Sequence, residues 1–392
     1  MLAAAVALVL SGCGPDEPAG PPPAIPTSLA GQSPQLAVDN TIGPDAVQHA
    51  VDSIDQLAAD LMRASGIPGL AVAVVHGGKT LYAKGFGVRD IRAGDGQQNR
   101  VDADTVFQLA SLSKPLGATV VAHQVGIGAI GWDTPIASKL PWFQLSNPDI
   151  ARMVTVGDLY SHRSGLPDHA GDLLEDLGYD RRYVLDHLRD LPLDPFRISY
   201  AYTNFGLTAA AEAVAAGAGE RWEDLAAEVL YRPLGMTSTS SRFADYAARP
   251  DRAVGHIHVD GKYEPEYVRD ADAQSPAGGV SSSVNDVARW MTMLLADGSY
   301  GGHRIVDPKA LQPALTPQIT SDRATEPAMR SGFYGYGFNV GTNAAGRVQL
   351  SHSGAFELGA GSNFLMIPSA DVAIARSICF DSPVMRPLAE GM

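Results

Sequence analysis

The strand-like segments constrain the fold most, because they occur near both ends of the chain and not in its middle. Residues 69–76 and 80–88 flank a Gly-Gly turn and predict a β-hairpin. Four more strands are predicted near the other end, at 334–341, 347–352, 361–367 and 371–379. We therefore expect an α/β (α+β) fold, in which the hairpin joins the late strands in one antiparallel sheet.

Helical patterns fill the rest of the chain. Apolar residues recur at helical spacing over residues 45–64. T-x-x-D at 155–158 and S-x-x-D at 283–286 both have the spacing of a capping box, and the second opens a predicted helix over 284–297. We expect a sheet flanked by helices, with an all-helical subdomain of about residues 112–270 inserted into the α/β part.

The amino-terminal residues are typical of an exported protein. Residues 2–10 are an apolar run too short to span a bilayer, and Ser11-Gly12-Cys13 follows. Small residues before a cysteine resemble the lipobox of bacterial lipoproteins, so we expect a signal peptide over 1–12 and lipidation of Cys13. The proline-rich residues 13–43 predict an extended linker. We therefore expect the protein in the periplasm or at the cell surface. An unmodified Cys13 is the alternative, because no Lys or Arg precedes the apolar run.

Composition argues against several classes of function. The chain has 29 Lys and Arg against 43 Asp and Glu, and a surface this acidic repels the phosphates of nucleic acids. Its two cysteines, Cys13 and Cys379, are too few for a disulfide framework or a cysteine-based zinc site. His256-x-His258 has no third ligand at metal spacing, so we expect strand alternation there and no metal or other cofactor.

Ser111 is the candidate nucleophile, in the segment FQLASLSKPLGA (107–118). Lys114 follows three residues later, which places both side chains on one helical face if Ser111 opens a helix. A serine hydroxyl needs a neighbouring group to take its proton, and a lysine whose pKa is lowered by burial can do so. A helix amino terminus also supplies N–H groups for an oxyanion. The alternative is a serine that caps the helix beside a solvent-facing lysine.

The segment YAYTNFG (200–206) lies farther along the chain. Tyr202 and Asn204 are two residues apart in a predicted loop, so both side chains can face one cleft. We expect Tyr202 to relay a proton between Ser111 and a leaving group, and to ionise readily beside the Lys114 ammonium. We expect the Asn204 amide to bind a substrate carbonyl and to orient Lys114. The alternative is a buried tyrosine followed by a turn asparagine.

A third segment, His352-Ser353-Gly354, ends a predicted strand. Gly354 allows a substrate backbone to lie along the strand edge. The N–H of Ala355 is then the candidate second oxyanion donor, facing that of Ser111. His352 is expected at the rim of the cleft as a polar or cationic contact. The alternative is a bulge glycine beside a hydrogen-bonded histidine.

Together these segments resemble the serine β-lactamase and penicillin-binding-protein family, in particular its class C-like, esterase and D-aminopeptidase branches. The family carries S-x-x-K, then Y-x-N, then K-T-G or H-x-G. The chain has the three motifs in this order, at Ser111-Lys114, Tyr202-Asn204 and His352-Gly354. The resemblance implies one hydrolase domain over residues 44–380. A short tail, 381–392, stands where the family has a closing helix.

The resemblance also implies the chemistry: a serine hydrolase without cofactor, which acts on ester or amide bonds through an acyl-enzyme. Ser111 attacks the carbonyl, and Lys114 with Tyr202 removes its proton. The oxyanion lies between the N–H groups of Ser111 and Ala355. His352 stands where β-lactamases carry lysine, which favours an esterase or a peptidase. The alternatives are a D,D-carboxypeptidase or β-lactamase, and a penicillin-binding receptor that deacylates slowly. The expected partner is a small ester, peptide or β-lactam, with membrane contact only through the lipid anchor.

Overall fold

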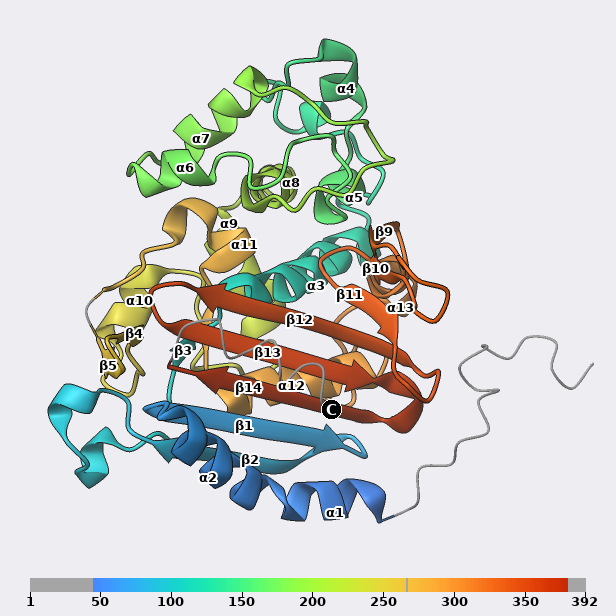
Figure 1. Cartoon of the computed structure of the whole chain (residues 1–392). Helices are drawn as coiled ribbons and strands as arrows, with labels where there is room; N and C mark the ends of the chain where they lie inside the picture. Colours follow the sequence, from blue (N-terminus) through green and yellow to red (C-terminus); the bar gives the residue numbers. More distant parts are fainter. Residues whose placement is uncertain (1–44, 266, 380–392) are drawn as a thin grey trace, which may run out of the picture.

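The computed structural model describes residues 45–265 and 267–379. The predicted signal peptide, Cys13, linker and 381–392 tail lie outside these residues and stay predictions. An antiparallel sheet of eight strands runs through the molecule in the order β2-β1-β14-β13-β12-β11-β10-β9 (Figure 1). Its strands are β1 (Gly69–His76), β2 (Lys79–Gly87), β9 (Ile319–Asp322), β10 (Gly332–Tyr334), β11 (Asn339–Thr342), β12 (Val348–Phe356), β13 (Ala360–Ile367) and β14 (Val372–Ile378).

The early hairpin and the last strand are neighbours in this sheet. β1 pairs with β14 from Leu70 opposite Ile378 to His76 opposite Val372, and β2 pairs with β1 on its other side. The two halves of the sheet therefore come from opposite ends of the domain. The predicted fold class and the pairing of residues 69–88 with the late strands are both confirmed.

Helices cover both faces of the sheet. The helices are α1 (Ala46–Asp52), α2 (Ile54–Ser65), α3 (Ser113–Gly126), α4 (Pro148–Met153), α5 (Val156–Tyr160), α6 (Asp172–Asp176), α7 (Arg181–His187), α8 (Asn204–Ala218), α9 (Trp222–Ala226), α10 (Phe243–Ala248), α11 (Ser275–Gly278), α12 (Val284–Leu295) and α13 (Pro308–Leu311). Ala58 of α2 packs with Leu70 and Val72 on one face. On the other face, α3 and α12 share the main core with Ala71 and Ala73. In Figure 1 the green helices α4 to α8 gather beyond the β12 side of the sheet, and α1 and α2 lie along β1 and β2.

Three short two-stranded sheets complete the fold. They are β3 (Phe107–Gln108) with β6 (Ser281–Ser282), β4 (Ile257–Val259) with β5 (Lys262–Glu264), and β7 (Ser299–Tyr300) with β8 (His303–Arg304). β3 leads directly into the segment that carries Ser111. Within the described ranges, no helix combines the length and the apolar content that crossing a membrane requires.

Some predicted elements differ from the structure in their limits. The helix expected over 45–64 is divided at Ser53, whose hydroxyl donates to the carbonyl of Ala50 at 2.8 Å. The strand expected over 334–341 is two short strands, β10 and β11, which pair as a hairpin. The chain reverses at Gly337, which has a φ of 77° and donates its N–H to the carbonyl of Tyr160 at 3.0 Å. A contact far away in sequence thus interrupts the strand pattern.

The two predicted capping boxes form differently. Thr155 and Asp158 make the full reciprocal pair at the start of α5. Ser283 accepts from the N–H of Asp286 at the start of α12, but the Asp286 carboxylate accepts from the N–H of Ser238 at 2.7 Å instead of closing the box. The spacing therefore located both helix starts, although only one has the complete motif.

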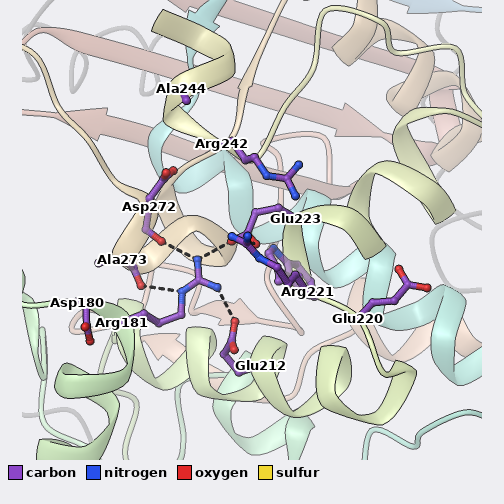
Figure 2. A pocket seen from close by; sticks show the side chains of 11 residues that line it. Asp180, Arg181, Glu212, Glu220, Arg221, Glu223, Arg242, Ala244, Asp272 and Ala273 are labelled. Carbon is purple, nitrogen blue, oxygen red and sulfur yellow. Dashed lines mark hydrogen bonds and ion pairs between the residues drawn. The ribbon is translucent and has the colours of Figure 1, made fainter.

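A partly buried ion-pair network joins α7, α8 and α9 around Arg181 of α7 (Figure 2). The Arg181 guanidinium donates to Glu212 of α8 at 2.5 Å and to Glu223 of α9 at 2.6 Å. It also donates to the carbonyls of Asp272 and Ala273, just before α11. Asn204 at the start of α8 and Ala277 in α11 both contact Lys114. The network around Arg181 therefore stabilises two elements that form the candidate site.

Candidate active site

Ser111 lies in a short 3-10 turn, Ala110–Leu112, directly ahead of α3. The predicted shared face of Ser111 and Lys114 was conditional on Ser111 opening the helix, but α3 begins two residues later, at Ser113. The residue before the serine, Ala110, has a φ of 47°, a left-handed conformation that non-glycine residues rarely adopt. The turn is fixed from outside, since the Ser362 hydroxyl donates to the carbonyl of Leu109 at 2.5 Å. The Ser111 hydroxyl is therefore presented on a constrained backbone.

Lys114 is fully buried and aligned on Ser111. Its Nζ lies 3.0 Å from Ser111 Oγ, 2.7 Å from Asn204 Oδ1 and 2.9 Å from the carbonyl oxygen of Ala277. Burial lowers the pKa of Lys114 to about 7. A neutral amine has two N–H groups and one lone pair. The two carbonyl oxygens of Asn204 and Ala277 accept from the N–H groups, so the lone pair is left for the proton of Ser111. The solvent-facing lysine of the alternative interpretation is excluded.

Tyr202 donates from its hydroxyl to Ser111 Oγ at 2.8 Å. Lys114 Nζ lies 4.5 Å from the centre of the tyrosine ring. Burial raises the pKa of Tyr202 well above its ordinary value, and the charge of Asp172 raises it further. The predicted convergence of the three side chains is present, but the prediction that Tyr202 ionises readily is wrong. In the free site the tyrosine is a donor and Lys114 is the group whose pKa is near neutrality.

Asn204 begins α8 and is the acceptor that orients Lys114, as its spacing from Tyr202 predicted. Its Nδ2 donates to Asp172 Oδ2 at 3.0 Å. Asp172 begins α6 and also accepts from His169 Nδ1 at 2.7 Å. Neither Asp172 nor the Ala277 carbonyl was predicted from the sequence, because neither lies in the three motifs and a backbone carbonyl leaves no residue-type signal.

His352 is buried beneath the site and not cationic. Its Nδ1 donates to the carbonyl of Ser353 at 2.7 Å, which leaves Nε2 to accept from the hydroxyl of Tyr334 at 2.8 Å. Burial lowers the pKa of His352 to about 3, and the Lys114 charge lowers it too. The expectation of a polar or cationic contact at the rim is therefore corrected: both ring nitrogens are occupied and the imidazole is neutral.

Gly354 brings β12 against the turn that carries the serine. The pairing of β12 with β11 ends at Ser351, so among the described residues the rest of β12 has no strand partner on that side. A Cβ at Gly354 would stand 2.1 Å from the carbonyl oxygen of Leu109 and 2.7 Å from the nitrogen of Ser111. Only glycine allows this approach. Ala355 follows on the same edge, and the role of its N–H as second oxyanion donor stays a prediction.

His162 supports the Tyr202 loop and was not singled out from the sequence. Its carbonyl accepts from the N–H of Ala201 at 2.9 Å and its Nδ1 accepts from the N–H of Thr203 at 3.2 Å, on either side of the tyrosine. Its ring lies 4.6 Å from that of Tyr202 and 4.9 Å from that of Tyr334, centre to centre. His162 lies in the segment SHRSG (161–165), and this segment is the sequence signal that could have identified it.

The described part of the chain contains no cluster of three or more His, Cys, Asp or Glu side chains suited to a metal ion. His256 is buried and its Nε2 accepts from the N–H of Ile91 at 3.3 Å. His258 lies on β4 with its ring 5.0 Å from that of Tyr263. The two histidines therefore do not alternate along one strand as expected: His258 lies in β4, but His256 lies just before it.

Comparison with known proteins gives one family and several relatives. The family described as "Beta-lactamase" matches residues 54–378. "Unguisins hydrolase ungD'" of Aspergillus campestris is 28% identical over 82% of this chain and 61% of its own length. "Penicillin-binding protein 4" of Amycolatopsis lactamdurans is 34% identical over 59% of this chain and 60% of its own length. "Esterase EstB" of Burkholderia gladioli is 30% identical over 55% of this chain and 57% of its own length. The chain thus spans about 60% of the length of these curated relatives.

Solved structures share the fold. A class C beta lactamase from Rhodobacter sphaeroides superposes with a TM-score of 0.68 at 21% identity, over 85% of this chain and 95% of the other. An octameric penicillin-binding protein homologue from Pyrococcus abyssi superposes with a TM-score of 0.71 at 21% identity, over 84% of this chain and 73% of the other. At this identity the similarity concerns the fold, and the chemistry is argued from the side chains above.

Proposed function

The chain belongs to the beta-lactamase family, and on that premise we propose that it is a serine hydrolase that cleaves ester or amide bonds through an acyl-enzyme on Ser111. The observation that carries the proposal is the junction at Ser111 Oγ. It accepts from Tyr202 at 2.8 Å and faces Lys114 Nζ at 3.0 Å. The pKa of Lys114 is about 7, so near neutral pH a large fraction of this lysine is a free base in contact with the nucleophile.

The proposed reaction begins when Ser111 Oγ attacks the carbonyl carbon and Lys114 takes the hydroxyl proton. The carbonyl oxygen becomes an oxyanion between the N–H groups of Ser111 and Ala355. As the tetrahedral intermediate collapses, Tyr202 gives its proton to the leaving group and recovers one from the Lys114 ammonium. Water then attacks the acyl-enzyme, with proton transfer in the reverse direction, and Ser111 is released.

The state of His352 favours substrates without a carboxylate next to the reacting bond. β-Lactams and D,D-peptides carry such a carboxylate, and a cation is its natural partner. The His352 imidazole is buried and neutral, and Tyr334 and Ser353 occupy both of its nitrogens. We therefore infer an esterase or a peptidase acting on uncharged groups, similar in class to the esterase among the relatives.

A panel of three chromogenic substrates tests this proposal. With p-nitrophenyl acetate we expect a burst that corresponds to one acyl group per site, followed by steady turnover. We expect lower kcat/KM for a D-alanyl p-nitroanilide, and the lowest for a chromogenic cephalosporin, which carries a carboxylate. Stopped-flow absorbance measures both phases. A burst without turnover would assign a slowly deacylating receptor instead, and the absence of acylation by any substrate or by a fluorophosphonate would refute the hydrolase.

The pH dependence of acylation provides an independent check. Lys114 accepts a proton only when neutral, and its folded-state pKa of about 7 lies below the ordinary lysine value. The kcat/KM for p-nitrophenyl acetate should therefore rise with pH to a plateau, with its midpoint near 7. The measurement is a pH–rate profile corrected for spontaneous ester hydrolysis. A flat profile across neutrality would show that another group accepts the proton.

A further inference from the structure

A continuous chain of hydrogen bonds leads from the molecular surface to the nucleophile. It begins at His169, whose side chain is 60% exposed and whose Nδ1 lies 2.7 Å from Asp172 Oδ2. The same carboxylate oxygen accepts from Asn204 Nδ2 at 3.0 Å. Asn204 Oδ1 in turn accepts from Lys114 Nζ at 2.7 Å, and Lys114 reaches Ser111. Every link joins a donor to an acceptor, and the donors on both sides point toward Asp172.

Asp172 determines which end of the Asn204 amide faces Lys114. A carboxylate only accepts hydrogen bonds, so the NH₂ end of the amide must point to Asp172. The oxygen end then necessarily points to Lys114. If the amide rotated by half a turn, its NH₂ group would face the lysine N–H groups and one of the two acceptors that align the amine would be lost. Asp172, which prevents this rotation, contacts Asn204 but belongs to none of the three motifs.

We propose that Asp172 is a positioning residue of this site: its carboxylate locks the amide of Asn204 and thereby keeps the amine of Lys114 aligned on Ser111. The inference rests on the proposed function, because alignment matters only if Lys114 accepts the serine proton. In this role Asp172 does not contact the substrate. His169 holds the carboxylate from the solvent side, through its Nδ1 at 2.7 Å from Asp172 Oδ2.

Charge gives Asp172 a second effect on the same lysine. Its negative charge raises the pKa of Lys114 against the lowering by burial. The other titratable groups around Lys114 are His162, His352 and Tyr202. Burial lowers the pKa of both histidines and raises that of the tyrosine, so all three are neutral near pH 7. Asp172 Oδ1 is buried without a hydrogen-bond partner among the described residues. The carboxylate is thus the charged neighbour through which the pKa of Lys114 can be tuned.

The test is the pH profile of the Asp172→Asn variant, which keeps the shape of the side chain but removes its charge and permits either amide orientation. The plateau of kcat/KM for p-nitrophenyl acetate should fall about tenfold, because the base is misaligned. The acidic limb should also move to lower pH, because the loss of the negative charge lowers the pKa of Lys114. General loosening of the fold would instead hydrate Lys114 and move the limb to higher pH, because burial is what lowers its pKa.

Asp168→Asn is the matched control. Asp168 is four residues away and 65% exposed, and it touches His169 but not Asn204. Its variant should keep both the plateau, within about twofold, and the position of the limb. Asp172→Ser is a second variant in case the amide substitution disturbs α6, because serine suits a helix start and carries no charge. Rates are expressed per site titrated with a fluorophosphonate, which corrects for any unfolded fraction.

The outcomes separate the two proposals. If the wild-type protein acylates, and the plateau falls and the limb moves to lower pH in both Asp172 variants but not in Asp168→Asn, the positioning role is supported. If the plateau stays at the wild-type level in both Asp172 variants, or falls equally in Asp168→Asn, the positioning role is refuted while the hydrolase stands. If the wild-type protein itself is not acylated, the proposed function has failed first.

Discussion

Ser111→Ala should abolish both ester turnover and covalent labelling by a fluorophosphonate, with a loss in kcat/KM of roughly 10⁴-fold or more. The hydroxyl of Ser111 is the atom on which the contacts of Lys114 and Tyr202 converge, so nothing replaces it as nucleophile. The fold should persist, because Lys114 keeps its acceptors on Asn204 and Ala277. Intact-protein mass spectrometry after incubation with the fluorophosphonate measures the label directly.

Ser113→Ala provides the control within the same segment. Ser113 is fully buried two residues later; its hydroxyl donates to the carbonyl of Ala110 at 2.6 Å and accepts from the N–H of Val280 at 3.0 Å. Its loss should lower the free energy of unfolding by about 1–2 kcal/mol but leave labelling stoichiometric. Labelling that survives in Ser111→Ala and disappears in Ser113→Ala would mean that the nucleophile has been assigned to the wrong serine.

The sheet was predictable where the sequence carries local signals. The run of Val and Ala in residues 69–76, the Gly-Gly turn and the late strands all follow from patterns a few residues long, and the fold they predict is confirmed. The strand expected over 334–341 was not predictable in the same way. Its interruption depends on Gly337 packing against the backbone of α3, where a Cβ would stand 2.8 Å from the Lys114 carbonyl oxygen. Tertiary contacts of this kind have no local pattern.

The candidate site was also predictable only in part. Its three motifs are short, ordered and made of reactive residue types, so the convergence of Ser111, Lys114 and Tyr202 was predictable. The ionisation of these residues was not, because it depends on burial. Burial lowers the pKa of Lys114 and raises that of Tyr202, which gives the base to the lysine in the free site. Spacing along a chain says nothing about how much solvent a side chain retains.

Gly354→Ala should show how closely fold and site depend on one another. A Cβ here would stand 2.1 Å from the carbonyl oxygen of Leu109 and 2.7 Å from the nitrogen of Ser111. Leu109 cannot easily retreat, since it donates to the carbonyl of Val280 at 2.8 Å and accepts from the Ser362 hydroxyl at 2.5 Å. Either β12 or the Ser111 turn must move. We expect kcat to fall by roughly 10²–10³-fold, because the two N–H groups proposed as oxyanion donors separate, and the free energy of unfolding to fall by about 1–3 kcal/mol.

The matched control is Gly341→Ala on the neighbouring strand β11, where a Cβ would meet nothing within 4 Å. This variant adds the same methyl group to the same sheet without touching the Ser111 turn, so its kcat should stay within about twofold of wild type. Urea denaturation and active-site titration of both variants separate lost stability from lost chemistry. If Gly354→Ala retains the wild-type kcat per titrated site, the close approach of β12 serves packing alone, and the oxyanion hole must be sought away from Ala355. If kcat falls while the titrated fraction stays high, the glycine is required because the strand edge and the nucleophile share one contact.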